Sequence, residues 1–304
     1  MAYRPIEVCG DREPSSLARC AAMVDDAMRT WVAEAALPAG LREAIEYSAI
    51  TGGKRLRPTL AILSAEAVGG KPESAIAAAG ALELVHAFSL VHDDLPAMDD
   101  DDLRRGMPTA HKKFGEAMAI LAGDAMLSLA FQALVERSAE KGLAGALTLE
   151  LSKGTTAMIA GQVYDTLGGT PAGVDGGAKA RLIHENKTGA LIVAACRMGA
   201  LSGMWPGVRE RALLALDGYG RAVGLMFQIV DDLLDVEQTT ETLGKRAGKD
   251  QNAGKVTYPG TIGAEASRTE VSRLHDEAMS AIEPLGEKAG ALAELCEYLA
   301  RRTR

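Results

Sequence analysis

Six of the ten residues from 93 to 102, in the run DDLPAMDDDD, are aspartates. The preceding segment, ALELVHAFSLVH, is largely apolar, so Asp93 and Asp94 are expected where a buried helix ends. The C-terminus of a helix carries partial negative charge, which disfavours carboxylates there unless a cation is bound nearby. A solvated acidic loop is the other interpretation of such a run. An oxygen ligand set completed by water and phosphate is typical of Mg²⁺ sites, and the position of the run favours this interpretation.

A second aspartate cluster, in FQIVDDLLD, follows about 140 residues later and consists of Asp231, Asp232 and Asp235. It also ends an apolar segment, AVGLMFQIV. At 100° per residue, a helix places these three side chains within an arc of roughly 100°. Two clusters of this kind in one chain are poorly explained as unrelated surface patches. Together they predict two carboxylate clusters that share metal ions through a bound anion.

Basic residues supply the complementary half of an anion site in a chain that is otherwise acidic. Arginine contacts a diphosphate through paired hydrogen bonds, whereas lysine supplies a point charge. Any one of these motifs alone is an ordinary solvated patch, but beside the aspartate clusters they indicate a diphosphate site. The candidates are the run GGKRLRP at 52–58, the pair Arg104 and Arg105, Lys187 before Thr188, and Lys245 and Lys255.

The elements that position these residues are predicted to be helices. Strand signals are nearly absent, with no clean alternation of apolar and polar residues. We predict a single all-α domain spanning 1–304, with long loops of functional character at 95–110 and 237–262. Apolar residues three and four positions apart predict helices over 15–36, 41–50, 58–68, 72–94, 115–138, 143–167, 176–187, 189–203, 207–235, 263–283 and 287–302.

Composition and charge exclude several classes of protein. The 33 basic and 41 acidic residues give a net charge of −8, so we expect no attraction to nucleic acid. The four cysteines form no CxxC pair, which argues against structural zinc and fits a reducing compartment. The N-terminus has no apolar signal-peptide core, and no uninterrupted apolar run reaches the roughly 18 residues of a membrane span. We therefore expect a cytoplasmic protein without a membrane span.

These motifs make the chain resemble the trans-prenyl diphosphate synthases, and most closely the bacterial farnesyl diphosphate synthases. The first aspartate-rich motif of that family appears as Asp93-Asp94 followed by Asp99, in the bacterial form with four intervening residues. The second aspartate-rich motif is also intact. So are GGKRLRP, the RRG after the first motif and the KT pair at 187–188. The resemblance is clearest over 40–262 and implies a bundle of long helices around a central cavity, in a homodimer.

The resemblance also implies two diphosphate sites. The allylic diphosphate is expected to bind through three Mg²⁺ ions and through Arg104, Lys187 and Lys245, while Lys255 closes the loop. The metal ligands implied are Asp93, Asp94, Asp99, Asp231, Asp232 and Asp235. Isopentenyl diphosphate is expected in a metal-free site formed by Lys54, Arg57, His86 and Arg105.

Ionisation of the allylic diphosphate would leave a carbocation, which needs polar neighbours that are not nucleophiles. The Lys187 carbonyl, the Thr188 hydroxyl and the Gln228 amide are expected to supply these dipoles, since Gln228 lies about one turn before Asp231. Gln162 and Asp165, one turn apart, are further candidates for the cavity wall. The 237–262 loop has the character of a lid that excludes water.

Product length is expected to depend on the residues just before Asp93. In the family, a bulky aromatic five positions before this form of the motif is associated with a farnesyl product, and that position is Phe88. Helix geometry instead places Ser89 on the face of Asp93 and Phe88 about 140° away, where it would be a packing residue. We favour a farnesyl (C15) product, with geranylgeranyl (C20) as the alternative.

Three other functions fit less of the sequence. Glu83 and His86 form one E-x-x-H motif of the kind that di-iron bundles use twice, but there is no second copy. A terpene cyclase would share the metal site but would not need the GGKRLRP motif. A non-catalytic partner subunit would be expected to lack one aspartate motif, and both are intact here.

Overall fold

The computed structural model describes residues 13–50, 52–138, 140–237 and 256–302. These residues are overwhelmingly helical, as predicted, and they group into two compact units. We call residues 15–152 with 197–209 the N-terminal unit, and residues 13–14, 153–196, 210–237 and 256–302 the C-terminal unit. Each unit is described by itself, and the expectation of a single domain stays a prediction.

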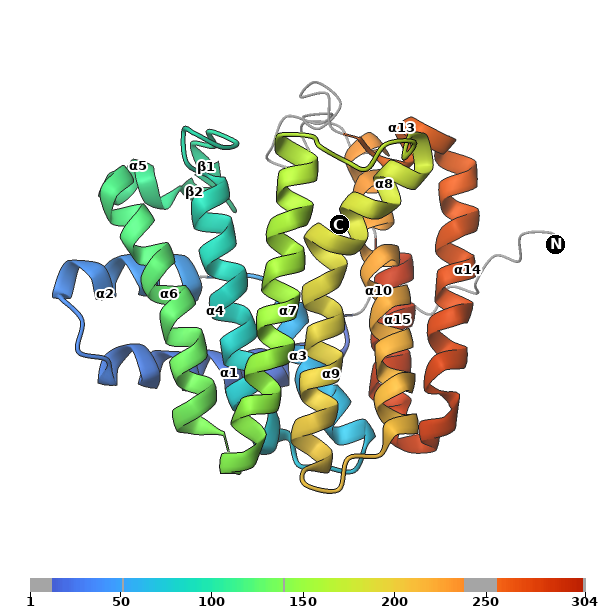
Figure 1. Cartoon of the computed structure of the whole chain (residues 1–304), viewed down its shortest axis with the longest axis horizontal. Helices are drawn as coiled ribbons and strands as arrows, with labels where there is room; N and C mark the ends of the chain where they lie inside the picture. Colours follow the sequence, from blue (N-terminus) through green and yellow to red (C-terminus); the bar gives the residue numbers. More distant parts are fainter. Residues whose placement is uncertain (1–12, 51, 139, 238–255, 303–304) are drawn as a thin grey trace. The chain divides into compact units, whose positions relative to one another are not determined.

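The N-terminal unit is built around two apolar helices, α3 and α4, whose side chains are almost entirely buried. Helix α4 runs beside α6, which Figure 1 shows in adjacent shades of green. The elements of the N-terminal unit are α1 (Ser15–Glu34), α2 (Ala39–Ile45), η1 (Glu46–Ile50), α3 (Leu56–Ala67), η2 (Pro72–Ala75), α4 (Ile76–Asp93), β1 (Leu103–Arg104), β2 (Met107–Pro108), α5 (Ala110–Phe114), α6 (Glu116–Arg137), the first half of α7 (Lys141–Thr166) and the second half of α9 (Ala190–Met204).

Small residues allow these helices to approach closely. A methyl group added at Gly123 of α6 would lie 2.1 Å from the His92 ring of α4, and one at Gly80 would lie 2.3 Å from the Trp31 ring of α1. These two glycines therefore have a packing role, because the absence of a side chain lets a residue of the neighbouring helix approach closely.

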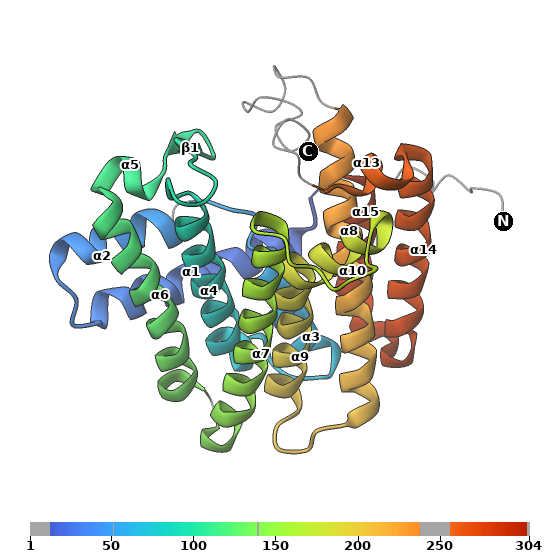
Figure 2. The ribbon, with the colours of Figure 1, turned by 45° about the horizontal axis from the view of Figure 1, so that its top comes forward.

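The C-terminal unit is centred on the long helix α10, which runs beside α14 (Figure 2). The Tyr219 side chain of α10 is fully buried and its hydroxyl donates to the Leu292 carbonyl, which ties α10 to α15. The elements are the second half of α7, α8 (Gly176–His184), η3 (Glu185–Gly189), the first half of α9 (Ala190–Met204), α10 (Glu210–Glu237), α13 (Tyr258–Ile262), α14 (Ala264–Ile282), η4 (Glu283–Ala289) and α15 (Gly290–Arg301).

The predicted helices are confirmed to within a few residues, but several local features were not predicted. Helices α5 and α13 are single turns, too short to show a helical period. The strands β1 and β2 form a two-residue antiparallel pair inside the predicted 95–110 loop. The turns η1 and η3 are π-helical, each with one extra residue in the helical ladder, and such turns are common at functional sites.

Among the residues that the structure describes, three helices are long and apolar enough to cross a membrane, judged by length and composition alone: Pro72–Asp93, Glu116–Arg137 and Glu210–Val236. Within the folded chain, 72%, 39% and 61% of their most apolar stretches are buried. The expectation that the chain has no membrane span therefore stays a prediction. Helix α6, with the lowest of the three values, presents an unusually apolar face to its surroundings.

Candidate active site

The first aspartate motif ends helix α4 and is held by an arginine from the short hairpin. Asp94 is buried, and it accepts three hydrogen bonds from Arg104: Nε lies 2.9 and 2.8 Å from its two oxygens, and Nη2 lies 2.6 Å from Oδ1. The neighbouring negative charges raise the pKa of Arg104 against the lowering effect of its burial. Two residues predicted to bind a metal and a phosphate are therefore each other's counter-ions.

The loop after Asp94 folds back onto the helix that precedes it. The Asp99 amide donates to the Asp93 carbonyl at 2.9 Å, and the Asp101 amide donates to the Asp94 carbonyl at 3.2 Å. Thr109 closes the loop by donating from its hydroxyl to the Asp101 carbonyl at 2.7 Å. These contacts return the Asp99 backbone to the end of α4 in spite of the four intervening residues.

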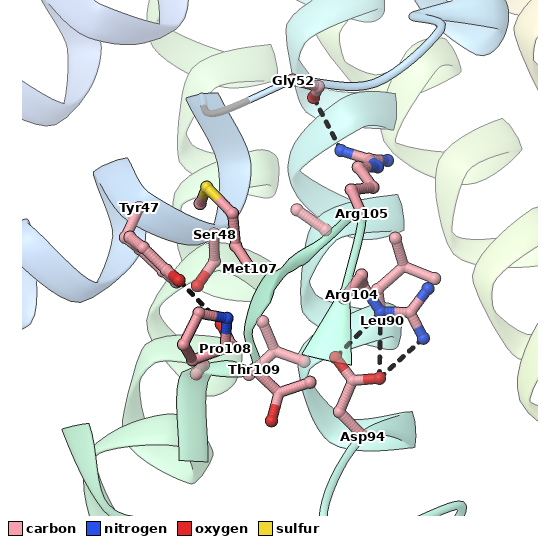
Figure 3. Close-up of a pocket in the computed structure, with 13 residues that line it drawn as sticks. Tyr47, Ser48, Gly52, Leu90, Asp94, Arg104, Arg105, Met107, Pro108 and Thr109 are labelled. Atoms are coloured by element: carbon pink, nitrogen blue, oxygen red, sulfur yellow. Dashed lines mark hydrogen bonds and ion pairs between the residues drawn. The ribbon is translucent and has the colours of Figure 1, made fainter. Parts of the chain in front are cut away.

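The hairpin aims two consecutive arginines in different directions, as Figure 3 shows. Its turn consists of Arg105 and Gly106, which both have positive φ (53° and 77°), as a two-residue type I′ turn requires. Arg104 lies on β1 and reaches Asp94, whereas Arg105 Nη1 donates to the Gly52 carbonyl at 2.7 Å. The hairpin therefore joins the first aspartate motif to the GGKRLRP loop.

A cavity of about 180 Å³ lies between these groups. Asp94, Arg104 and Arg105 line it on one side, and Tyr47 of η1 and Met107 of the hairpin line it on another (Figure 3). The Tyr47 hydroxyl donates to the Pro108 carbonyl at 2.7 Å, which fixes the hairpin against η1. The π-helical turn that the sequence did not reveal therefore supports one wall of the cavity.

His86 lies in a region of positive charge. Its pKa is lowered well below the usual value, first by burial and then by the positive charges of Arg57, Arg105, Arg104 and Arg55. A neutral imidazole surrounded by guanidinium groups is the arrangement expected beside a bound anion. Of the predicted isopentenyl diphosphate residues, Arg57, His86 and Arg105 therefore share one electropositive region. Lys54 is exposed at the edge of the same loop.

The two chain-length candidates are placed by helix α4. The Phe88 side chain is buried and packs edge-on against the His92 ring, with centroids 5.7 Å apart. His92 in turn lies 3.1 Å from the Ile120 carbonyl of α6. The Ser89 hydroxyl donates to the His86 carbonyl one turn back. Phe88 therefore takes part in α4–α6 packing, and its role in product length stays a prediction.

The second aspartate motif lies in the C-terminal unit, where Asp232 is a buried hydrogen-bond centre. Its Oδ2 lies 2.9 Å from His184 Nε2 and accepts from the Tyr258 amide at 2.9 Å, while its Oδ1 accepts from Gln228 Nε2 at 3.2 Å. The His184 and Tyr258 rings stack at 5.6 Å. The Asp232 carboxylate thus joins α8, α10 and α13.

The polar residues predicted around a carbocation are linked to this centre. The Thr188 hydroxyl, in the π-helical turn η3, donates to Gln228 Oε1 at 2.9 Å. Lys187 Nζ lies 2.6 Å from Asp165 Oδ2 of α7. The η3 backbone packs directly on α7, because a methyl group added at Gly161 would lie 2.2 Å from the Lys187 nitrogen. The C-terminal unit therefore brings Thr188 to Gln228 and Lys187 to Asp165, and the roles predicted for these residues stay predictions.

Asp231 has a partner that the sequence analysis missed. Arg302, just after α15, places Nη2 at 2.7 Å from Asp231 Oδ1 and 2.9 Å from the Phe227 carbonyl. Its guanidinium also lies over the Phe227 ring at 4.0 Å. Asp93, Asp99, Asp231 and Asp235 are all partly exposed, whereas Lys245 and Lys255 lie outside the described residues.

Comparison with known proteins decides the family. A profile of the Polyprenyl synthetase family matches residues 38–296. Farnesyl diphosphate synthase of Escherichia coli K12 is 43% identical over 302 residues, which cover 96% of this chain and 99% of that protein. The chain belongs to the polyprenyl synthetase family. As a member of this family it is a prenyltransferase.

Other members of the polyprenyl synthetase family are similarly close. Chloroplastic geranylgeranyl pyrophosphate synthase 11 of Arabidopsis thaliana is 46% identical over 275 residues, covering 87% of this chain and 75% of its own. The crystal structure of geranylgeranyl pyrophosphate synthetase from Pyrococcus horikoshii has 30% identity and a TM-score of 0.84, covering 94% of this chain and 98% of that one. These likenesses include enzymes named for two different products.

The donor chemistry of this polyprenyl synthetase suits Mg²⁺, although the ligands are sparse. Among the described residues, no group of three or more histidine, cysteine, aspartate or glutamate side chains is placed to hold a metal by itself. Mg²⁺ is commonly held by one or two carboxylates, with waters and substrate phosphates completing its shell. The carboxylate oxygens at the ends of α4 and α10 fit this mode of binding, in which the substrate brings part of the ligand set.

Proposed function

We propose that this protein condenses isopentenyl diphosphate with an allylic diphosphate, first dimethylallyl and then geranyl, to give farnesyl diphosphate and free diphosphate. The observation that carries the proposal is the positive charge of Arg57 and Arg105 around His86, in the same unit as the first aspartate motif. A terpene cyclase needs one diphosphate site only. A second anion site without clustered carboxylates favours a condensing enzyme.

Mg²⁺ is the metal we propose, and when bound it would supply positive charge that stabilises the departing diphosphate. The buried Asp94 and Asp232 are held by protein donors, so they suit orienting roles beside the ions. Arg104 and Lys187 are held in place by Asp94 and Asp165, and their charges are thereby fixed before a diphosphate binds. The aspartates that best suit the metal-facing role are the partly exposed Asp93, Asp99, Asp231 and Asp235.

Thr188 and Gln228 are suited to face an allylic carbocation. The Thr188 proton is directed to Gln228 Oε1, and the Gln228 amide donates to Asp232. This relay fixes the orientation of both dipoles and leaves the Thr188 oxygen lone pairs to stabilise positive charge. Neither group is a strong nucleophile, so the cation can persist until the double bond of isopentenyl diphosphate attacks C1 of the allylic group. A proton is then lost, and we propose the released diphosphate as its acceptor.

Two observations favour a farnesyl product. The Escherichia coli farnesyl diphosphate synthase aligns over 99% of its own length, and a buried aromatic, Phe88, stands five positions before Asp93. The geranylgeranyl product is the second candidate, because the plant geranylgeranyl synthase is 46% identical and Phe88 packs on His92.

We further propose that the protein is a homodimer in the cytoplasm. An apolar face of α6 supports the dimer, since Ile120, Leu121 and Val135 are 44%, 56% and 67% exposed, and faces of this kind commonly form protein interfaces. The scattered cysteines support the location. Light scattering of the purified protein and fractionation of cells that express it would test the two statements.

The decisive experiment is a product assay. Purified protein is incubated with Mg²⁺, labelled isopentenyl diphosphate and dimethylallyl diphosphate, and the dephosphorylated alcohols are sized by chromatography. Farnesol is the expected product. Geranylgeraniol would keep the condensation and replace the farnesyl assignment with the second candidate. Diphosphate release that EDTA abolishes, without any elongation, would point to a cyclase.

A further inference from the structure

Arg55 is a charged residue of the GGKRLRP loop that none of the proposed roles uses. It is only 4% exposed, although Lys54 before it is exposed and Arg57 after it is partly exposed. Its backbone is left-handed, with φ of 48° and ψ of 34°, at the position that starts helix α3. A side chain with a β-carbon is disfavoured in this region of backbone space, so something in the surroundings must hold it there.

Three hydrogen bonds hold the Arg55 guanidinium. Nη1 donates to Glu83 Oε1 of α4 at 2.5 Å, Nε donates to Asp25 Oδ1 of α1 at 2.8 Å, and Nη2 donates to the Ile50 carbonyl at the end of η1 at 3.1 Å. The Glu83 side chain is 4% exposed and that of Asp25 is 30% exposed, so the bond to Glu83 is the best shielded from water. One side chain therefore ties the loop to three separate elements.

The same network lies next to residues of the predicted isopentenyl diphosphate site. Glu83 lies one helical turn before His86 on α4, so the two side chains share a face of the helix. The pKa of Arg105 is lowered, first by its burial, and the negative charge of Glu83 offsets part of this lowering. With each guanidinium nitrogen hydrogen-bonded inside the protein and its side chain 3% exposed, Arg55 is not available to contact a diphosphate in solvent.

We propose that Arg55 and Glu83 are positioning residues for the homoallylic diphosphate. The ion pair holds the left-handed start of α3, and this backbone turn directs Lys54 and Arg57 toward the anion while Arg55 points into the protein. The inference rests on the proposed function, since it concerns the isopentenyl diphosphate site. The Arg55–Glu83 ion pair would then affect the binding of isopentenyl diphosphate and not that of the allylic diphosphate.

The test separates the two substrates. Arg55→Lys keeps the charge but loses the planar fork, and Glu83→Gln keeps the shape but loses the charge. We expect each variant to raise KM for isopentenyl diphosphate by roughly 10- to 100-fold, because small misplacements of binding groups have effects of this size. The kcat and the KM for the allylic diphosphate should change by less than about threefold. Asp25→Asn should have a smaller effect, since Asp25 is partly exposed.

A matched control exists on the same helices. Arg19 of α1 and Glu66 of α3 form an exposed paired contact, at 3.0 and 2.7 Å, away from the loop. Glu66→Gln removes a charged contact between α1 and α3 but should leave both KM values unchanged. The double variant Arg55→Lys/Glu83→Gln should lose about as much as either single variant, because the two residues act as one unit.

Calorimetric titration of isopentenyl diphosphate, without an allylic substrate, measures the same effect without turnover. Weaker binding by Arg55→Lys and Glu83→Gln but not by Glu66→Gln supports the proposal even if the wild-type protein fails to elongate, a result that would overturn the proposed function alone. Unchanged affinity in folded Arg55→Lys and Glu83→Gln proteins overturns the proposal. Equal changes in both KM values and in kcat, in step with the melting temperature, would show a merely structural role and would also overturn it.

Discussion

The two aspartate motifs hold their second aspartate in different ways. Asp94, in the N-terminal unit, is bound by one charged partner, Arg104, through three hydrogen bonds. Asp232, in the C-terminal unit, is bound by His184, Gln228 and the Tyr258 backbone, and none of these carries the fixed charge of an arginine. Both carboxylates are buried, with exposures of 2% and 4%. The second aspartate of the pattern is therefore held by a salt bridge in one unit and by a hydrogen-bond network in the other.

This difference matters because the two kinds of support respond differently to loss of charge. The Arg104 side chain is 28% exposed, so removing its negative partner leaves a charge that water reaches only in part. Hydrogen-bond donors without a fixed charge require only an acceptor atom. The side-chain oxygen of an amide can take the place of a carboxylate oxygen in that role. The N-terminal motif is therefore expected to be the more fragile of the two when an aspartate is made neutral.

The largest expected effect comes from Asp94→Asn. It removes the negative charge that holds Arg104, and we expect kcat/KM for condensation to fall by about 10²- to 10³-fold. Asp232→Asn should lower it by only about tenfold, since the asparagine oxygen still accepts from His184 or Tyr258. Steady-state kinetics on both folded variants would measure the difference. Equal losses would contradict the distinction between the two motifs.

The next largest effect is expected from a change in backbone packing within the C-terminal unit. Gly161→Ala would place a methyl group 2.2 Å from the Lys187 nitrogen, so η3 must move away from α7. We expect a loss of about 1–3 kcal/mol in unfolding free energy, as for other overpacked sites. Lys187 and Thr188 move with η3, so kcat should fall as well.

Gly145→Ala is the matched control for this change, because it lies in the same helix with no atom within 4 Å of the added methyl group. Its unfolding free energy should rise by up to about 1 kcal/mol, as expected for replacing glycine in a helix. Denaturant unfolding of the two variants measures both values. A neutral Gly161→Ala protein with unchanged kcat would show that η3 does not need its close contact with α7.

A pH effect of intermediate size belongs to the N-terminal unit. The pKa of His86 is lowered in the folded protein, so below about pH 6.5 the unfolded chain binds a proton that the folded chain does not. This group therefore removes stability as pH falls below about 6.5, by up to about 1.4 kcal/mol per pH unit, and contributes nothing to pH dependence above it.

The His86→Gln variant isolates this contribution. Its unfolding free energy should fall less steeply than that of the wild type between about pH 6.5 and 5, with convergent slopes above pH 7. Denaturant midpoints at several pH values give the two curves. Parallel curves across the whole range would show that His86 titrates normally, and the cluster of arginines would then not act on it.

The sequence predicted those parts of the site that lie close together along the chain. The aspartate runs, GGKRLRP and the Lys187-Thr188 pair each form a continuous signal, and the helices that carry them show a regular apolar period. Partners that are distant in sequence were not visible: His184 is 48 residues from Asp232, and Glu83 is 28 residues from Arg55.

The local departures from regular structure were also missed, for a different physical reason. A π-helical turn such as η3 preserves the composition of a helix while adding one residue to its ladder, and the β1–β2 hairpin is too short to show alternation. Both depend on tertiary contacts: Gly161 allows the first, and the Tyr47 hydroxyl fixes the second. Such features are formed by packing, which propensity does not encode.

The smallest expected effect would sharpen the comparison at the first aspartate of the second motif. Arg302 contacts Asp231 Oδ1 at 2.7 Å, and the Asp231 side chain is 39% exposed whereas that of Arg302 is 1% exposed, so the carboxylate is open to a metal ion while the guanidinium is buried. A divalent ion that binds Asp231 must compete with this guanidinium. Arg302→Met should therefore lower the Mg²⁺ concentration for half-maximal thermal stabilisation by up to about fivefold.

The corresponding substitution in the N-terminal unit should destabilise the protein. Arg104→Met removes the partner of the buried Asp94, which leaves an uncompensated carboxylate and should lower the melting temperature before any metal is added. Measuring both variants with Mg²⁺ and with Ca²⁺ separates competition for Asp231 from a general charge effect. An unchanged Mg²⁺ midpoint in Arg302→Met would show that the C-terminal arginine and the metal do not share this carboxylate.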